Sequence, residues 1–180
     1  MKLLLRSLGE LVAVTLLVFA TGWGGVRLAE RVHRHPVGAG RGGIIELRIV
    51  KSDRHGDVSF EEGPGYVGWW RCRGKEWAVE WRFAPESTRH YNVEVRLSSP
   101  ERLAGEKIEV AIRDRKGGGD RWLRLQAVVP DTGGPAKWMT LSMGEVPLEA
   151  LPYTLIVRPG STGLTSLNVK SVIIRPVESR

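Results

Sequence analysis

Residues that could do covalent or acid–base chemistry are few and scattered in this sequence. There is no HExxH pair, no Gly-x-Ser-x-Gly elbow and no glycine-rich loop that opens a helix. Cys72 is the single cysteine, and Arg71 and Arg73 beside it would favour its thiolate. No partner for it is visible, so we expect an inert thiol. Glu61 and Glu62 are adjacent, and adjacent strand residues point to opposite faces, so they cannot form a glycosidase acid pair. We interpret them as a solvated loop end.

The tryptophans are more informative than the titratable residues. Trp77 and Trp81 alternate with polar residues in the stretch WAVEWRF, which predicts that both rings face a core. Trp69 and Trp70 are neighbours in an extended segment, so one of them should point outward. Trp138 shares its parity with Thr140 and Ser142, which predicts a ring on a polar face.

Trp122 follows the same rule, because it shares its face with Arg124 and Gln126. A large ring exposed beside polar groups is costly without a partner. Flat aromatic rings next to hydrogen-bonding groups are how proteins hold sugars, since the apolar face of the sugar stacks while its hydroxyls are hydrogen-bonded. A strand bulge would reverse the parity and return a ring to the core.

The elements that must position these rings are strands. Apolar and polar residues alternate with a period of two, which is typical of half-buried antiparallel strands. This pattern occurs in Ile44–Val50, Trp77–Phe83, Tyr91–Leu97, Lys107–Arg113, Leu123–Val129, Met139–Met143, Tyr153–Val157 and Leu167–Ile174. Turn residues separate the strands, and no capped helix lies between them. The sequence therefore predicts an all-β, antiparallel β-sandwich of the jelly-roll, galactose-binding-like type, over residues 44–180.

Residues 1–26 differ from the rest of the chain. Lys2 and Arg6 precede the apolar run Leu11–Ala20, and small residues follow it, as in a secretory signal. A retained hydrophobic helix over Leu11–Val26 would instead anchor the chain, although its 16 residues are short for a membrane span. A buried helix of the domain is the third interpretation. We expect an exported domain, secreted, periplasmic or tethered, whose only membrane contact is this segment, followed by a basic, glycine-rich linker over residues 27–43.

Charge and composition limit the partners. The chain has 180 residues and a net charge of +7. After residues 1–35 are set aside, 22 basic and 18 acidic residues remain, and they are interspersed. A nucleic-acid-binding protein would show a more concentrated basic patch, so we expect no nucleic-acid partner. We expect no cofactor. Calcium often stabilises exported β-sandwiches, and Asp114, Asp120 and Asp131 are the candidate ligands, but their spacing fits no calcium loop.

An ordered set of short segments resembles a known class of domain. The chain is similar to the β-sandwich modules appended to exported fucosidases and sulfatases of planctomycete-like bacteria and, more distantly, to family-6 and family-35 carbohydrate-binding modules. The segments that carry the resemblance are His55–Glu61, Val67–Trp70, Val79–Phe83, Asp131–Gly134, Trp138 six residues before Gly144, Tyr153–Pro159 and Leu167–Val172.

The resemblance implies a site and a function. In the sugar-binding modules the matching positions line a cleft, so Trp69 and Trp138 would stack against a sugar and Asn168 would hydrogen-bond its hydroxyls. The chain departs from the pattern at Pro135, where a stacking tryptophan is common, and at Lys170, near the usual place of an aspartate. The expected function is non-catalytic binding of a glycan or envelope polysaccharide. The alternative is a structural sandwich that binds another envelope protein.

Overall fold

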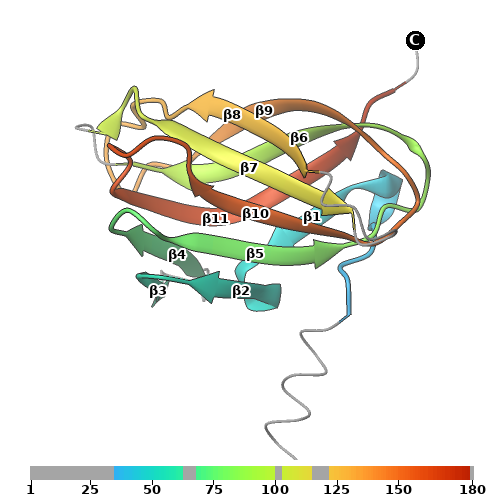
Figure 1. Ribbon diagram of the computed structural model, residues 1–180, viewed down its shortest axis with the longest axis horizontal. Coiled ribbons are helices and arrows are strands. Elements are labelled where there is room, and N and C mark those ends of the chain that lie inside the picture. The colour runs from blue at the N-terminus through green and yellow to red at the C-terminus, as the bar shows by residue number, and fades with distance from the viewer. Residues whose placement is uncertain (1–34, 63–67, 100–102, 115–121, 179–180) are drawn as a thin grey trace, which may run out of the picture. The chain divides into compact units, whose positions relative to one another are not determined.

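The computed structural model describes residues 35–62, 68–99, 103–114 and 122–178. The chain divides into two units, Met1–His35 and Pro36–Arg180, and the second is a two-layered β-sandwich (Figure 1). The predicted signal or anchor segment, residues 1–26, lies outside the described residues. Within the described ranges, no helix is long and apolar enough to cross a membrane.

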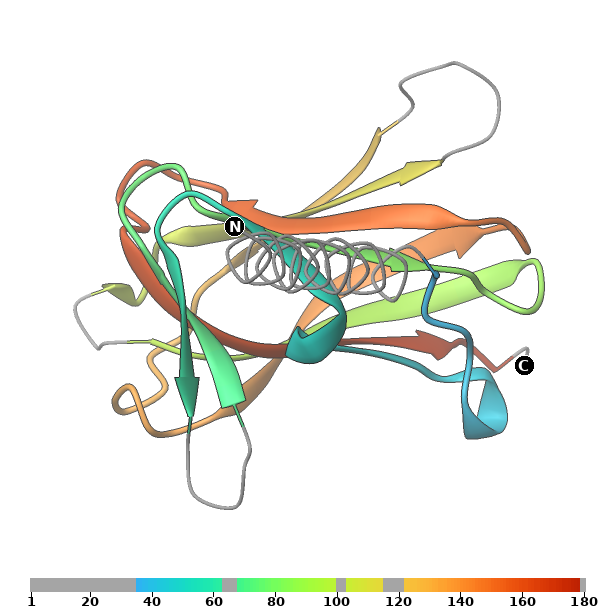
Figure 2. The same cartoon turned by 90° about the horizontal axis from the view of Figure 1, so that it is seen from below.

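Two antiparallel sheets form the layers, which Figure 2 shows edge-on. The six-stranded sheet has the order β3 (Val58–Glu62), β4 (Gly68–Arg73), β11 (Ser166–Pro176), β6 (Arg89–Ser98) and β9 (Met139–Leu148), with β1 (Ile45–Arg48) also paired to β11. The five-stranded sheet has the order β2 (Ser52–His55), β5 (Ala78–Phe83), β10 (Tyr153–Pro159), β7 (Lys107–Asp114) and β8 (Trp122–Val128). Short 3₁₀ turns are η1 (Arg41–Gly43) and η2 (Ile49–Lys51). The predicted all-β antiparallel sandwich is confirmed.

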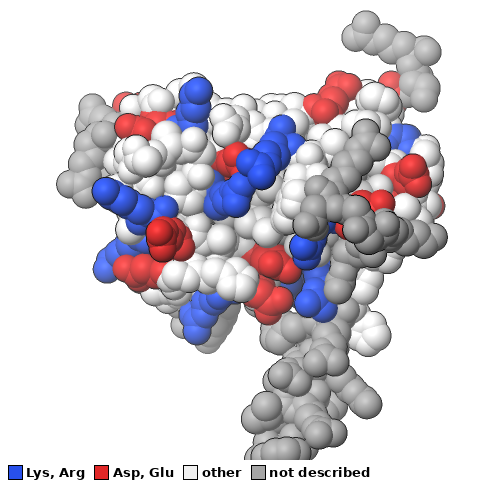
Figure 3. All heavy atoms as spheres, in the orientation of Figure 1, with Lys and Arg blue, Asp and Glu red and all other residues white. Residues whose placement is uncertain are grey.

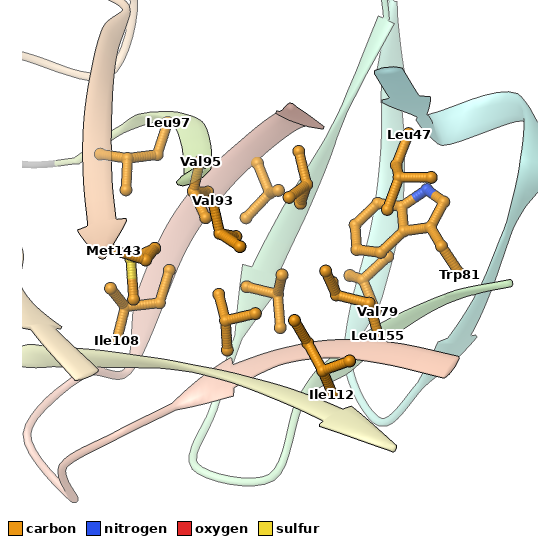
Figure 4. Close-up of a cluster of buried hydrophobic side chains, with 14 of the residues drawn as sticks. Leu47, Val79, Trp81, Val93, Val95, Leu97, Ile108, Ile112, Met143 and Leu155 are labelled. Atoms are coloured by element: carbon orange, nitrogen blue, oxygen red, sulfur yellow. The ribbon is translucent and has the colours of Figure 1, made fainter. Parts of the chain in front are cut away.

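The core lies between the sheets and follows the predicted alternation. In β6 the buried hydrophobic residues are Tyr91, Val93, Val95 and Leu97, and the residues between them face outward. Figure 4 shows side chains of β6 meeting those of β5, β7 and β10 from the opposite sheet. Trp77 and Trp81 are fully buried, which confirms their predicted core position. Burial of such side chains supplies the main stabilising free energy.

One strand that was not predicted is short and polar. The predicted strands do not include β2, which runs from Ser52 to His55 along the edge of the five-stranded sheet. Its side chains are mostly exposed, so it lacks the alternation that marks a half-buried strand. Glu61, expected at a loop end, lies within β3.

Part of the segment expected as a linker is joined to the sandwich. Val37 forms an isolated parallel bridge with Phe83, its amide donating to the Arg82 carbonyl at 2.8 Å. The Val37 carbonyl accepts from the Ala84 amide at 3.0 Å. The second unit accordingly begins at Pro36, before the first predicted strand residue, Ile44.

Candidate functional site

Trp138 lies on the outer face of the six-stranded sheet, as its parity predicts. The ring is half-buried, and Thr140 and Ser142 further along β9 are exposed on the same face. The Lys170 ammonium lies 5.3 Å from the centroid of the Trp138 ring, within the range of a cation–π contact. An aromatic ring, hydroxyls and a cation are therefore gathered on one polar face.

A bulge in β11 brings Lys170 to this face. Val169 and Val172 are both fully buried although they are three residues apart, so the period of two is interrupted between them. The pairing of β11 with β6 shifts at the same point, between Val169 and Ser171. The extra residue leaves Lys170 directed away from the core, toward Trp138.

The loop before Trp138 is fixed by buried polar contacts. The Thr132 hydroxyl accepts a hydrogen bond from the Ser99 amide at 3.1 Å and lies 3.0 Å from the Ser99 carbonyl oxygen. The Asp131 carboxylate accepts from the Gly133 amide at 2.7 Å, which closes the turn. Buried polar groups that are satisfied in this way hold a segment in one geometry. The loop therefore presents Trp138 from a preorganised position.

Asn168, expected to hydrogen-bond a sugar, lies beneath this loop. Its side chain is only 5% exposed. The amide nitrogen lies 3.0 Å from the Pro135 carbonyl oxygen and 3.2 Å from the Ser98 hydroxyl oxygen. Ser98 also donates to the Pro135 carbonyl, at 2.7 Å. The observed contacts of Asn168 thus position the loop that carries Trp138.

Trp69 lies in β4, the strand next to β11, and is paired in register with Glu61 of β3. Its side chain is outside the described part of the structure. Arg71, two residues further along β4, forms an ion pair with Glu61 at 3.1 Å. Trp70 is buried, and its indole nitrogen donates to the Ser52 hydroxyl at 2.7 Å.

Two basic residues at this site were not predicted as ligand-binding. Lys170 was noted from the sequence only as a departure from the family pattern. Arg96 is exposed on β6, in register with Ser171 of β11 on one side and Thr140 of β9 on the other. Burial lowers the pKa of Lys170, and the positive charge of Arg96 lowers that pKa further. The sequence shows the alternation of polar and apolar residues. The bulge that directs Lys170 toward Trp138 could not be located from that alternation.

A separate pocket of about 350 Å³ lies at the other end of β6. Arg89 and His90 at the beginning of β6 line it, together with Asp114 at the end of β7 and Tyr153 at the start of β10. None of the three predicted site residues lies among its lining residues.

Cys72 and the candidate calcium ligands complete the set of predicted residues. Cys72 is fully buried, and burial followed by the charge of Asp57 raises the pKa of its thiol, which is opposite to the effect expected from its arginine neighbours. The Asp131 carboxylate closes its turn, Asp114 lines the pocket, and Asp120 lies outside the described residues. Among the described side chains, no group of three His, Cys, Asp or Glu is arranged to hold a metal ion.

The five-stranded sheet presents a different outer surface. Figure 3 shows basic and acidic side chains interspersed on this side, with no large area of one sign. Trp122 lies here, half-buried, with the Arg113 guanidinium 5.1 Å from its ring centroid. Its predicted parity with Arg124 and Gln126 is confirmed by the pairing of β8 with β7.

The two layers define a β-sandwich whose fold is similar to that of solved carbohydrate-binding modules. No family model and no curated protein matches the sequence. A family 35 carbohydrate-binding module from Clostridium thermocellum has a similar structure, with a TM-score of 0.58 and 11% identity, over 74% of this chain and 98% of that one. The C-terminal family 6 module of a marine laminarinase from Zobellia galactanivorans has a TM-score of 0.54 and 19% identity, over 73% of this chain and 98% of the module.

Larger proteins contain the same fold. The GH26–CBM35 β-(1,4)-mannanase of Podospora anserina matches with a TM-score of 0.55 and 13% identity, over 78% of this chain. This chain spans only 29% of that enzyme. At such identities the likeness shows the fold, and the function must be argued from the residues of this chain.

Proposed function

We propose that the chain is an exported, non-catalytic module that binds a glycan on the outer face of its six-stranded sheet, with Trp138 as the stacking residue. The observation that carries the proposal is the half-buried Trp138 ring, held beside exposed hydroxyls by a loop with buried hydrogen bonds. Sugar recognition needs this combination of a flat apolar surface and nearby hydrogen-bonding groups.

The loop contacts favour binding over a purely structural role for the ring. A ring that merely fills a core would be buried, as Trp77 and Trp81 are. Trp138 instead remains partly exposed while the backbone before it is tightly held. Preorganisation lowers the entropic cost of binding, which matters for a ligand as flexible and well hydrated as a polysaccharide.

Export is proposed from the sequence. Residues 1–26 combine a positive start, an apolar run and small residues, so the sandwich would function outside the cytoplasm, either released or tethered through this segment. Soluble or envelope-bound polysaccharides are the glycans that such a module would meet.

A protein partner is the alternative function. Phe60 is 48% exposed on β3, the edge strand of the six-stranded sheet, and packs edge-on against Trp70. An exposed ring on an unpaired strand edge is a surface that another envelope protein would contact. This alternative predicts binding that depends on Phe60 and is indifferent to Trp138.

A glycan array and affinity gels with the full-length chain test the proposal. Trp138→Ala should weaken retention about tenfold or more, equivalent to a loss of about 1.4 kcal/mol. Trp122→Ala is the matched control, because Trp122 is also half-buried beneath a cation but lies on the other sheet. Near-UV circular dichroism verifies that both variants are folded. Equal retention of both variants, or no retention of the native chain by any glycan, would contradict the proposal.

A further inference from the structure

Three basic residues on the outer face of the six-stranded sheet are paired with acidic neighbours. Arg71 pairs with Glu61 at 3.1 Å, Arg175 pairs with Glu94 at 3.1 Å, and Arg48 of β1 pairs with Glu46 at 2.7 Å. Such partly exposed pairs contribute little to stability, but they leave no net charge at their positions.

Lys170 and Arg96 are two neighbouring cations on this face without such a pair in the described part of the chain. Neither has an acidic group within 4.0 Å among the residues that the structure describes. Arg96 is in register with Ser171, the residue after Lys170, so the two cations occupy adjacent strands at the same level. Two like charges held together in a partly desolvated place are unfavourable unless an anion joins them.

The position of the Lys170 ammonium discriminates between kinds of sugar. It lies over the Trp138 ring, so a neutral sugar that stacks on that face must displace it and lose the cation–π contact. An acidic sugar displaces the same contact but gives the ammonium an anionic partner. Charge-assisted hydrogen bonds of this kind are worth more than the contact that is lost.

We propose that Lys170 and Arg96 bind the acidic group of the glycan, a uronic-acid carboxylate or a sulfate ester, while Trp138 contacts the sugar that carries it. The inference rests on the function proposed above and names the ligand class of that site. Carboxylate and sulfate both suit an ammonium beside a guanidinium, so the two sources are separated by experiment.

The test compares charged polysaccharides with their neutral counterparts. The full-length chain is run in affinity gels that contain polygalacturonate, fully methyl-esterified pectin, dextran sulfate or dextran, and a gel with duplex DNA controls for polyanions in general. The native chain should be retained at least fivefold more strongly by one acidic polysaccharide than by its neutral counterpart. The acidic polysaccharide that retains it identifies carboxylate or sulfate as the ligand.

Charge variants locate the interaction. Lys170→Gln and Arg96→Gln should each weaken retention by the acidic polysaccharide about fivefold, whereas Lys170→Arg should preserve it. Lys51→Gln is the matched control, since Lys51 is exposed on η2 and its loss changes the net charge equally. An equal loss in Lys51→Gln, or equal retention by duplex DNA, would show nonspecific attraction and overturn the inference.

Failure of the inference and failure of the proposed function give different results. Equal retention by the neutral and acidic polysaccharides, dependent on Trp138, would refute the acidic specificity and leave glycan binding intact. No retention by any glycan in the gels or on the array would refute both.

Discussion

Asn168 was expected to contact the ligand, but its observed hydrogen bonds hold the loop that carries Trp138. The Asn168 amide nitrogen lies 3.0 Å from the carbonyl oxygen of Pro135, a position at which the sequence departs from the pattern it resembles. The loop is thereby attached to β11 through a proline carbonyl, and the aromatic surface is supplied by Trp138 three residues later. In this arrangement Asn168 is a positioning residue.

Asn168→Ala should lower the free energy of unfolding by about 1–3 kcal/mol, because the change leaves the buried Ser98 hydroxyl and the Pro135 carbonyl with fewer hydrogen bonds. Asn92 lies on β6 and is more exposed than Asn168. Asn92→Ala should therefore lower the free energy of unfolding by less than about 1 kcal/mol. Urea denaturation measures both. Unchanged stability of Asn168→Ala together with lost glycan binding would show instead that Asn168 contacts the sugar directly.

Glu109 is the most buried carboxylate among the described ion pairs, and it lies on the opposite sheet. Burial alone would raise its pKa, but hydrogen bonds from Gln126 and Arg158, with the charges of Arg158 and Arg124, hold the pKa below its ordinary value of 4.5. A carboxyl group with a lowered pKa in the folded state stabilises the fold above its unfolded pKa. That contribution is lost as the pH falls through the lowered value.

Glu109→Gln should therefore reduce the free energy of unfolding at pH 7 by about 1–3 kcal/mol, and the difference from the native chain should shrink as the pH falls below about 4.5. Urea denaturation at a series of pH values, with the two proteins compared at each pH, gives the difference. A difference that stays constant down to pH 2 would show that the charge of Glu109 is not what stabilises the pair.

At the scale of elements, strands with one buried face could be predicted from the sequence, and a strand without a buried face, such as β2, could not. The alternation of Tyr91–Leu97 reports burial directly, because every second residue enters the core. β2 has no buried side chain, and its pairing with β5 is made by the backbone. A β-bulge also leaves no pattern in the sequence. The side of the strand on which Trp138 lies was therefore predictable, but the contact of Lys170 with its ring was not.

The turn from β2 to β3 connects the two sheets, so its backbone geometry is constrained. Gly56 in this turn has φ +73°, and a Cβ there would lie 2.3 Å from the Glu76 carbonyl oxygen. Gly74 has nearly the same φ, +75°, and open space around it. The two glycines therefore separate backbone strain from steric contact.

Gly74→Ala should lower the free energy of unfolding by about 1–2 kcal/mol through its left-handed conformation alone. Gly56→Ala should cost about 1–3 kcal/mol more, because the backbone at Glu76 must move. Thermal and urea denaturation of the two variants measure the difference. Equal losses would mean that the turn relaxes and that the close contact does not constrain it.

At the scale of the whole molecule, the two outer faces differ in what they offer a ligand. The five-stranded sheet presents interspersed basic and acidic side chains, and Glu109 is buried there beside Gln126 and Arg158. The six-stranded sheet carries the Trp138 ring with the Lys170 ammonium beside it and Arg96 on the adjacent strand. The fold, the core and the location of Trp138 followed from residue types. The cation pair required the register of β11 against β6, which depends on contacts between distant segments.

Hydrogen–deuterium exchange on the full-length chain, with and without the glycan that the array selects, tests most directly whether this face is the binding surface. The account predicts slower exchange in residues 130–142 and 166–171, with no change around Arg89 and Tyr153 at the opposite pocket. Protection confined to that pocket, or to Phe60 and its strand, would contradict the assignment of glycan binding to Trp138.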